Sequence, residues 1–205
     1  MLDHLVYAAP DLDQAIDDIE RRLGVRPAYG GKHTGGLTHN ALLSLGEGTY
    51  LEIIAPVPDS APTGSPLPFG LNTLEAPRLV TWSTKAPDID RRIEAARAAG
   101  YDPGDAVAGG RDLPDGSRLS WRVSFRPQLP GDGIVPFLTQ WLSEPHPSTA
   151  APAGCRFVSL RAEHPEAGSV RGILNALTVD LPVTECPAPR LISTLDTPNG
   201  RVELS

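Results

Sequence analysis

The sequence predicts an α+β fold built from repeated units, each with a strand, a helix and then two or three further strands. The first observation is an internal repeat, because the turn Ala-Pro-Asp at residues 9–11 recurs 77 residues later at 86–88. A strand-like run precedes the turn both times and a helix-like run follows it. The second observation is the strict alternation of apolar and polar side chains over residues 118–126, which is the period of a strand with two different faces.

The first unit opens with a strand over residues 2–8. The periodicity then predicts a helix over 11–23, with Asp11 as its N-cap and Gly24 as its stop. Residues 29–36 are glycine-rich and include His33; they are expected to be a loop, either a flexible connection or a place where backbone approaches a ligand. Two strands follow, at residues 40–45 and 49–54, joined by a short turn.

A proline-rich linker over residues 56–78 leads to the second unit. This unit has predicted strands at 79–84, 118–126 and 135–142 and a helix at 90–99. After a second linker, a third and smaller unit of βαββ type is expected, with strands at 156–162, 191–195 and 202–204 and a helix at 165–177. The predicted division is a domain over 1–142, made of modules 1–55 and 79–142, and a C-terminal unit over 155–205.

The composition and net charge of the chain limit the kinds of partner that it is expected to bind. The chain has 205 residues, of which 40% are hydrophobic and 21% are charged, as is ordinary for a globular protein. Its net charge of -7 argues against nucleic acid as a partner, because phosphate binding needs a basic surface. An anionic small molecule stays compatible with this charge, since a local arginine cluster can oppose the overall sign.

The same features predict a cytoplasmic protein that does not enter a membrane. No apolar run approaches the roughly 18 residues that a membrane span needs, and the first residues read as a folded strand rather than a signal peptide. The two cysteines, Cys155 and Cys186, lack metal-type spacing and are expected to be buried or idle thiols in a reducing compartment.

Two polar side chains stand out because each lies alone in an apolar strand. His4 is either a metal ligand or a hydrogen-bonded histidine in a cavity wall. Glu52 is harder to explain as a structural residue, because a buried carboxylate must be paired, protonated or bound to a metal. It could bind a metal, act as a general base with a raised pKa, or pair with an arginine. We expect His4 and Glu52 to meet in one cavity.

Arg122, Asn40 and Trp121 are the predicted substrate-binding residues. Arg122 is central on the polar face of the strand at 118–126, where its guanidinium could meet a carboxylate or phosphate. The alternative is that this face is simply solvated. Asn40 points opposite the apolar positions of its own strand and is therefore a candidate for the cavity. No Ser/His/Asp or Cys/His arrangement and no nucleotide-binding loop can be assembled.

Several motifs resemble one known superfamily. They are DHLVY at 3–7, DLD at 11–13, NALLSLG at 40–46, YLEII at 50–54, DG at 115–116, LSWR at 119–122 and PFLTQW at 136–141. In order and spacing these runs are similar to the vicinal-oxygen-chelate superfamily, and the later ones to its glyoxalase-like domain of the glyoxalase 3 type. The resemblance covers residues 2–142.

The resemblance implies paired βαβββ modules whose sheet curls into a half-barrel, with helices outside and a cavity on the concave face. Members commonly hold a divalent metal there, through ligands on the first and last strands of each module. The implied ligands are His4, Glu52 and Gln140, and the metal could be Zn, Mn, Ni, Fe or Mg. Thr81 occupies the position equivalent to His4, and the position equivalent to Glu52 falls near Thr139 or Gln140.

The implied function is a metal-dependent lyase, isomerase or dioxygenase that acts on a small oxygenated, anionic metabolite, with Glu52 as the catalytic residue. The alternative is a non-catalytic protein that sequesters a small molecule in a cavity with a vestigial metal site. The low aromatic content, 5%, counts against a drug-sequestering site. A homodimer is a further expectation, because relatives often pair modules between chains.

Overall fold

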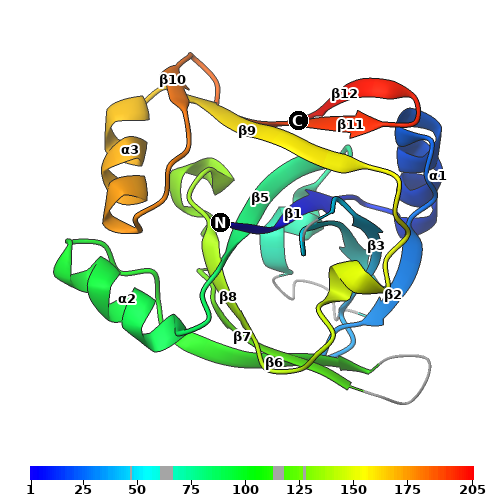
Figure 1. Cartoon of the computed structure of the whole chain (residues 1–205), viewed down its shortest axis with the longest axis horizontal. Helices are drawn as coiled ribbons and strands as arrows, with labels where there is room; N and C mark the ends of the chain where they lie inside the picture. Colours follow the sequence, from blue (N-terminus) through cyan, green and yellow to red (C-terminus); the bar gives the residue numbers. More distant parts are fainter. Residues whose placement is uncertain (47, 61–66, 113–117, 127) are drawn as a thin grey trace.

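The computed structural model describes residues 1–46, 48–60, 67–112, 118–126 and 128–205. An eight-stranded sheet curves around a central space, and a four-stranded sheet packs against one side of it (Figure 1). Part of the predicted linker, residues 61–66, and the Asp-Gly pair at 115–116 lie outside the described residues. In the part of the chain that is described, no helix is long and apolar enough to cross a membrane.

The large sheet is made by the two repeated halves. The first half contributes β1 (Leu2–Ala8), α1 (Leu12–Leu23), β2 (Ala28–Lys32), β3 (Thr38–Ser44) and β4 (Tyr50–Pro56). The second contributes β5 (Arg78–Lys85), α2 (Ile89–Ala98), β6 (Ala106–Asp112), β7 (Arg118–Ser124) and β8 (Phe137–Trp141). The strand order is β2-β3-β4-β1-β5-β8-β7-β6, so β1 and β5 join the halves at the centre. The expected α+β fold of paired βαβββ modules is confirmed.

The third unit forms the smaller sheet, in the order β10-β9-β11-β12. Its elements are β9 (Arg156–His164), α3 (Ala167–Ala176), β10 (Val183–Glu185), β11 (Arg190–Thr197) and β12 (Gly200–Leu204). Three short 3-10 segments complete the described structure, namely η1 (Pro68–Thr73), η2 (Pro130–Gly133) and η3 (Pro147–Thr149). In Figure 1 this sheet and the three helices lie on the outside of the curved sheet.

Helix α1 forms for the reasons that its sequence suggests. The Asp11 side chain accepts a hydrogen bond from the backbone N–H of Gln14 at 2.9 Å, and Gly24 ends the helix in the left-handed conformation. One apolar face is buried against the outer side of the sheet. The second Pro-Asp turn works in the same way, because the Asp88 side chain caps α2 through the N–H of Arg91.

Alternation along β1 separates the two faces of the large sheet. Leu5 and Tyr7 belong to the main core, which continues into Leu195 and Leu204 of the smaller sheet. Val6 and Ala8 belong to a second apolar cluster on the opposite, concave face. Residues two apart on a strand share a face, so His4 lies on the concave side with Val6.

The sheet curls until its two edge strands touch. His33 and Arg111 form an antiparallel bridge between the ends of β2 and β6. Thr34 reinforces this seam, because its backbone N–H and its hydroxyl both donate to the carbonyl of Gly110, at 3.1 and 2.7 Å. The closure brings side chains of the first and second halves to one cavity.

Candidate functional site

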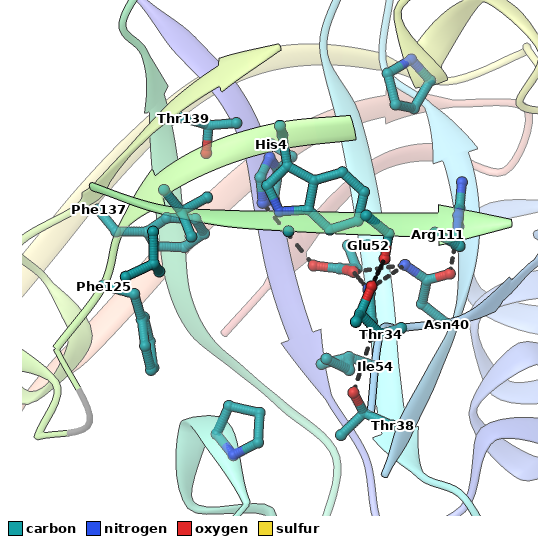
Figure 2. Close-up of a pocket in the computed structure, with 18 of the residues that line it drawn as sticks. His4, Thr34, Thr38, Asn40, Glu52, Ile54, Arg111, Phe125, Phe137 and Thr139 are labelled. Carbon is teal, nitrogen blue, oxygen red and sulfur yellow. Dashed lines mark hydrogen bonds and ion pairs between the residues drawn. The ribbon is translucent and has the colours of Figure 1, made fainter. Parts of the chain in front are cut away.

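The concave face holds a cavity of about 430 Å³ with one polar end and one aromatic wall (Figure 2). The polar side chains that line it are His4, His33, Thr34, Thr38, Asn40, Glu52, Arg111 and Thr139. The aromatic side chains are Tyr50, Phe69, Trp121, Phe125, Phe137 and Trp141. Figure 2 shows Phe125 and Phe137 on one side of the space and Glu52, Asn40 and Arg111 on the other.

The aromatic wall is denser than the composition suggested. Although aromatic residues make up only 5% of the chain, two of its three Trp and three of its four Phe line this cavity. Trp121 and Trp141 lie with ring centroids 5.3 Å apart, and Phe125 contacts Phe137 edge to face. Low aromatic content therefore does not argue against an aromatic ligand site here.

Glu52 is the centre of the polar end. Its Oε1 accepts a hydrogen bond from Asn40 Nδ2 at 2.6 Å and lies 3.3 Å from His33 Nε2. Its Oε2 lies 3.9 Å from His4 Nε2, so the predicted meeting of His4 and Glu52 in one cavity is found. Only 7% of Glu52 is exposed.

The pKa of Glu52 is lowered, whereas one of the three roles considered for this residue, that of a general base, would need a raised pKa. Burial acts to raise its pKa, but the hydrogen bond and charge of His33, the charge of His4 and the hydrogen bond from Asn40 outweigh burial. Together they lower the pKa of Glu52 from 4.5 to about 2. The carboxylate is therefore ionised at neutral pH.

This shift makes a testable contribution to acid stability. A folded-state pKa below the unfolded value stabilises the fold above about pH 4.5, and the contribution is lost as pH falls towards 2. The shift corresponds to about 3 kcal/mol. We expect the free energy of unfolding, measured by urea titration, to fall less between about pH 5 and pH 3 in a Glu52→Gln variant than in the parent. Glu94→Gln, at an exposed position of α2, should keep the parental pH dependence; an equal flattening in both variants would contradict the prediction.

Arg111 orients the amide that holds Glu52. Its Nη1 donates to Asn40 Oδ1 at 2.5 Å, which leaves Asn40 Nδ2 to donate to the carboxylate. The arginine is only 4% exposed and lies against the backbone of Gly30. A methyl group at Gly30 would overlap both Arg111 Nη1 and Asn40 Oδ1, so a glycine is needed there for close packing. Sequence reasoning missed Arg111, because its partners are far away in the chain.

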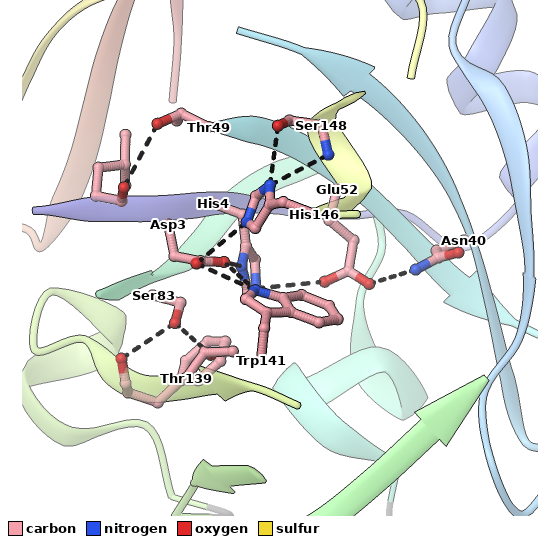
Figure 3. Close-up of polar contacts among 12 residues, drawn as sticks. Asp3, His4, Asn40, Thr49, Glu52, Ser83, Thr139, Trp141, His146 and Ser148 are labelled. Carbon is pink, nitrogen blue, oxygen red and sulfur yellow. Dashed lines mark hydrogen bonds and ion pairs between the residues drawn. The ribbon is translucent and has the colours of Figure 1, made fainter. Parts of the chain in front are cut away.

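A second buried carboxylate, Asp3, holds His4 from behind (Figure 3). Asp3 Oδ1 lies 2.7 Å from His4 Nδ1, and Trp141 Nε1 donates to the same carboxylate at 3.2 Å. His146 Nε2 approaches Asp3 Oδ2 at 3.4 Å. Burial acts to raise the pKa of Asp3, but the hydrogen bonds of His146 and His4 outweigh it and lower the pKa. An ionised Asp3 fixes the His4 ring, with Nε2 turned towards Glu52.

Neither Asp3 nor His146 was singled out from the sequence. Neighbours on a regular strand point to opposite faces, so Asp3 and His4 should have pointed apart. The pairing of β1 with β5 shifts register between Leu2 and His4, and this irregularity brings the two side chains together.

The structure places Arg122 and Gln140 away from the cavity. Arg122 forms a two-pronged ion pair with Asp90 of α2, with N–O distances of 2.7 and 2.8 Å. Gln140 donates to the carbonyl of Pro87 on the same outer side. The expectation that Arg122 faces the cavity is wrong, because the aromatic face of β7, with Trp121, is the one that lines it.

The donor set does not fit a metal ion. Among the described residues, no group of three or more His, Cys, Asp or Glu side chains is arranged to hold one.

The strand registers explain why the second half adds no ligand. Val6 pairs with Glu52 in the first half, and Ser83, 77 residues after Val6, pairs with Phe137 in the second. Phe137, rather than Thr139 or Gln140, therefore occupies the place of Glu52, and Thr81 that of His4.

Similar proteins were found among the solved structures. A hypothetical protein from Staphylococcus aureus superposes with a TM-score of 0.66 at 14% identity, over 98% of this chain and 83% of that one. Methylmalonyl-CoA epimerase from Mycobacterium tuberculosis matches with a TM-score of 0.44 at 20% identity, over 73% of this chain and 91% of that one. A selenomethionine form of methylmalonyl-CoA epimerase matches with a TM-score of 0.45 at 21% identity, over 69% of this chain and 95% of that one.

The search of curated proteins found no match. The family model described as "Glyoxalase-like domain", in contrast, matches residues 2–178, which is most of the chain. The match begins in β1, which carries His4, and it includes the whole curved sheet. The chain therefore belongs to the glyoxalase-like domain family.

Proposed function

We propose that this protein binds a small organic molecule in the cavity of the curved sheet. The ligand would lay an apolar or aromatic part against Trp121, Phe137 and their neighbours, and it would present a polar group to Glu52 and Asn40. The observation that carries the proposal is the cavity itself, about 430 Å³ in volume, with aromatic rings opposite a buried, ionised carboxylate. Ligand sites typically combine an apolar lining with a few fixed polar groups in this way.

A metal-dependent lyase, isomerase or dioxygenase has less support. Such chemistry needs a metal held by several protein ligands. Here Thr81 and Phe137 occupy the positions in the second half that correspond to His4 and Glu52 in the first, so the second half supplies no further pair of metal ligands. Gln140 lies on the outer side of the sheet. An anionic substrate was expected because Arg122 could bind it, but Arg122 forms an ion pair with Asp90. Binding without metal chemistry is the function that the side chains of the cavity support best.

Tryptophan fluorescence offers a direct test. Trp121 and Trp141 line the cavity, whereas Trp82 is buried in the main core and donates to the carbonyl of Ile134 at 2.8 Å. A library of small aromatic and aliphatic metabolites would be screened by thermal shift, because a ligand that binds only the folded state raises Tm. We expect hits to change the fluorescence of the parent protein and of a Trp82→Phe variant.

A double variant, Trp121→Phe with Trp141→Phe, is the matched comparison. It keeps an aromatic wall but removes both reporters, so the same ligands should still raise its Tm while leaving its fluorescence almost unchanged. Ligands that change only the signal of Trp82 would bind elsewhere. A screen in which no compound raises the Tm of the parent would also contradict the proposal.

A further inference from the structure

We propose that the polar group recognised by this cavity is an organic cation, such as a protonated amine carried on an aromatic or apolar body, with Glu52 as its anchor. This inference rests on the proposed function and adds the charge of the ligand to it. Its support comes from the charges, the open hydrogen-bond acceptor and the rings around the cavity.

Glu52 carries a negative charge at the polar end of the cavity. Within the described residues, no Lys or Arg forms an ion pair with this carboxylate. The guanidinium of Arg111 lies within range of the charge of Glu52, but its hydrogen bonds reach the carboxylate only through the neutral amide of Asn40. The possible ion-pair partners of this buried carboxylate are the rings of His33 and His4, which are charged only when they are protonated. Removing a carboxylate from water is compensated best by a permanent opposite charge. A ligand cation would supply that charge.

One oxygen of the Glu52 carboxylate, Oε2, remains open as a hydrogen-bond acceptor among the described residues. Asn40 and His33 both approach Oε1 of Glu52. No described residue forms a hydrogen bond to Oε2. His4 Nε2 lies 3.9 Å from Oε2, which is too far for a hydrogen bond. Charge-assisted hydrogen bonds from N–H to a carboxylate are about twice as strong as neutral ones. An ammonium group at Oε2 would therefore gain both a hydrogen bond and a charge pair.

Several aromatic rings line the cavity together with this carboxylate. Tyr50 stacks on His4 with ring centroids 4.7 Å apart, and Phe137 meets the His4 ring edge at 5.4 Å. Trp121 and Trp141 line the same space. The faces of aromatic rings attract cations and do not attract anions. The net charge of the protein, -7, also favours the approach of a cation over that of an anion.

Arg111 does not make the cavity an anion site. Its guanidinium is packed against Gly30 and donates to Asn40, and its Nε is enclosed by protein and has no described hydrogen-bond partner. It is thus turned towards the wall that holds Glu52. The internal competitor for Glu52 is His33, whose protonation would place a positive charge beside Oε1 and leave Oε2 open.

Three ligands with one ring system and different head groups test the inference. Isothermal titration calorimetry at neutral pH would compare 2-(1-naphthyl)ethylamine, 2-(1-naphthyl)ethanol and 1-naphthylacetate, which carry an ammonium, a hydroxyl and a carboxylate. For the parent protein we expect the ammonium compound to bind at least about tenfold more tightly than the alcohol, and the carboxylate to bind most weakly. This comparison needs no variant to fold.

The Glu52→Gln variant then tests the anchor. It should reduce the preference of the ammonium compound over the alcohol to less than about threefold, while the affinity for the alcohol changes little. Glu94→Gln removes the same charge from the exposed face of α2 and should leave the preference unchanged.

The outcomes separate the two proposals. Equal or tighter binding of the alcohol or the carboxylate would overturn the cation inference and leave small-molecule binding in place. If none of the three binds while the library yields neutral or anionic ligands, the cation inference fails alone. If neither the three compounds nor the library bind, both proposals fail.

Discussion

An Asp3→Ala variant should lose about 3–5 kcal/mol of unfolding free energy. Asp3 is 0% exposed, and it accepts hydrogen bonds from Trp141 and from the rings of His4 and His146. Removing the carboxylate leaves the buried ring of His4 and the half-buried side chains of Trp141 and His146 without their acceptor, and it leaves any positive charge on the two histidines uncompensated. The loss would be measured by urea unfolding at neutral pH.

Two controls define the cause of that loss. Asp180→Ala removes a carboxylate at an exposed position and should change the unfolding free energy by less than about 0.5 kcal/mol. Asp3→Asn keeps the shape and one acceptor oxygen, so its loss should be smaller than that of Asp3→Ala. If alanine and asparagine at position 3 have equally small effects, the Asp3 network does not hold the site together.

The second large effect is expected from Gly133→Ala, at about 4 kcal/mol or more. Gly133 has a φ of 92°, a conformation that side chains rarely adopt. A Cβ there would also overlap the carbonyl oxygen of Val80 and lie 3.0 Å from its carbonyl carbon. Val80 belongs to β5, a central strand, so the backbone it meets cannot easily move away.

Thermal and urea unfolding followed by circular dichroism would measure this effect. Gly168→Ala, in helix α3, is the matched control, because no described atom beyond its chain neighbours and the backbone of its own helix lies within 4 Å of the added methyl group. It should be neutral or stabilising by up to about 1 kcal/mol. A Gly133→Ala protein within about 1 kcal/mol of the parent would show that the backbone around Val80 adapts.

The repeated units of the fold could be predicted because local signals mark them. Each Pro-Asp turn supplies a helix cap, and the strands β1, β4, β5 and β7 are rich in apolar or alternating side chains. The two edge strands were missed. Both β2 and β6 contain a Gly-Gly pair, which reads as loop, and they form strands because they close the seam beside Arg111.

The site was predictable only where one residue carried its own signal. His4 and Glu52 were found because a lone polar group in an apolar strand needs a reason to be there. Arg122 was misplaced because alternation defines two faces without saying which one lines a cavity. We expected apolar side chains to face the helices, whereas on β7 they face the ligand space. The contacts of Arg111 and His146 join distant segments, and no local pattern encodes them.

The two halves of the repeat have different tasks in the cavity. The first half provides His4, Asn40 and Glu52, whereas Trp121, Phe125, Phe137 and Trp141 all come from the second half. Arg111 and Thr139 add polar groups from the second half, but the carboxylate of Glu52 and its hydrogen-bond donor Asn40 both lie in the first half. The ring surface of the second half is therefore free to vary. Changes on β7 and β8 could therefore alter the size and shape of the molecule accepted, independently of the head group recognised on β3 and β4. This separation would let one scaffold diversify its ligands in small steps.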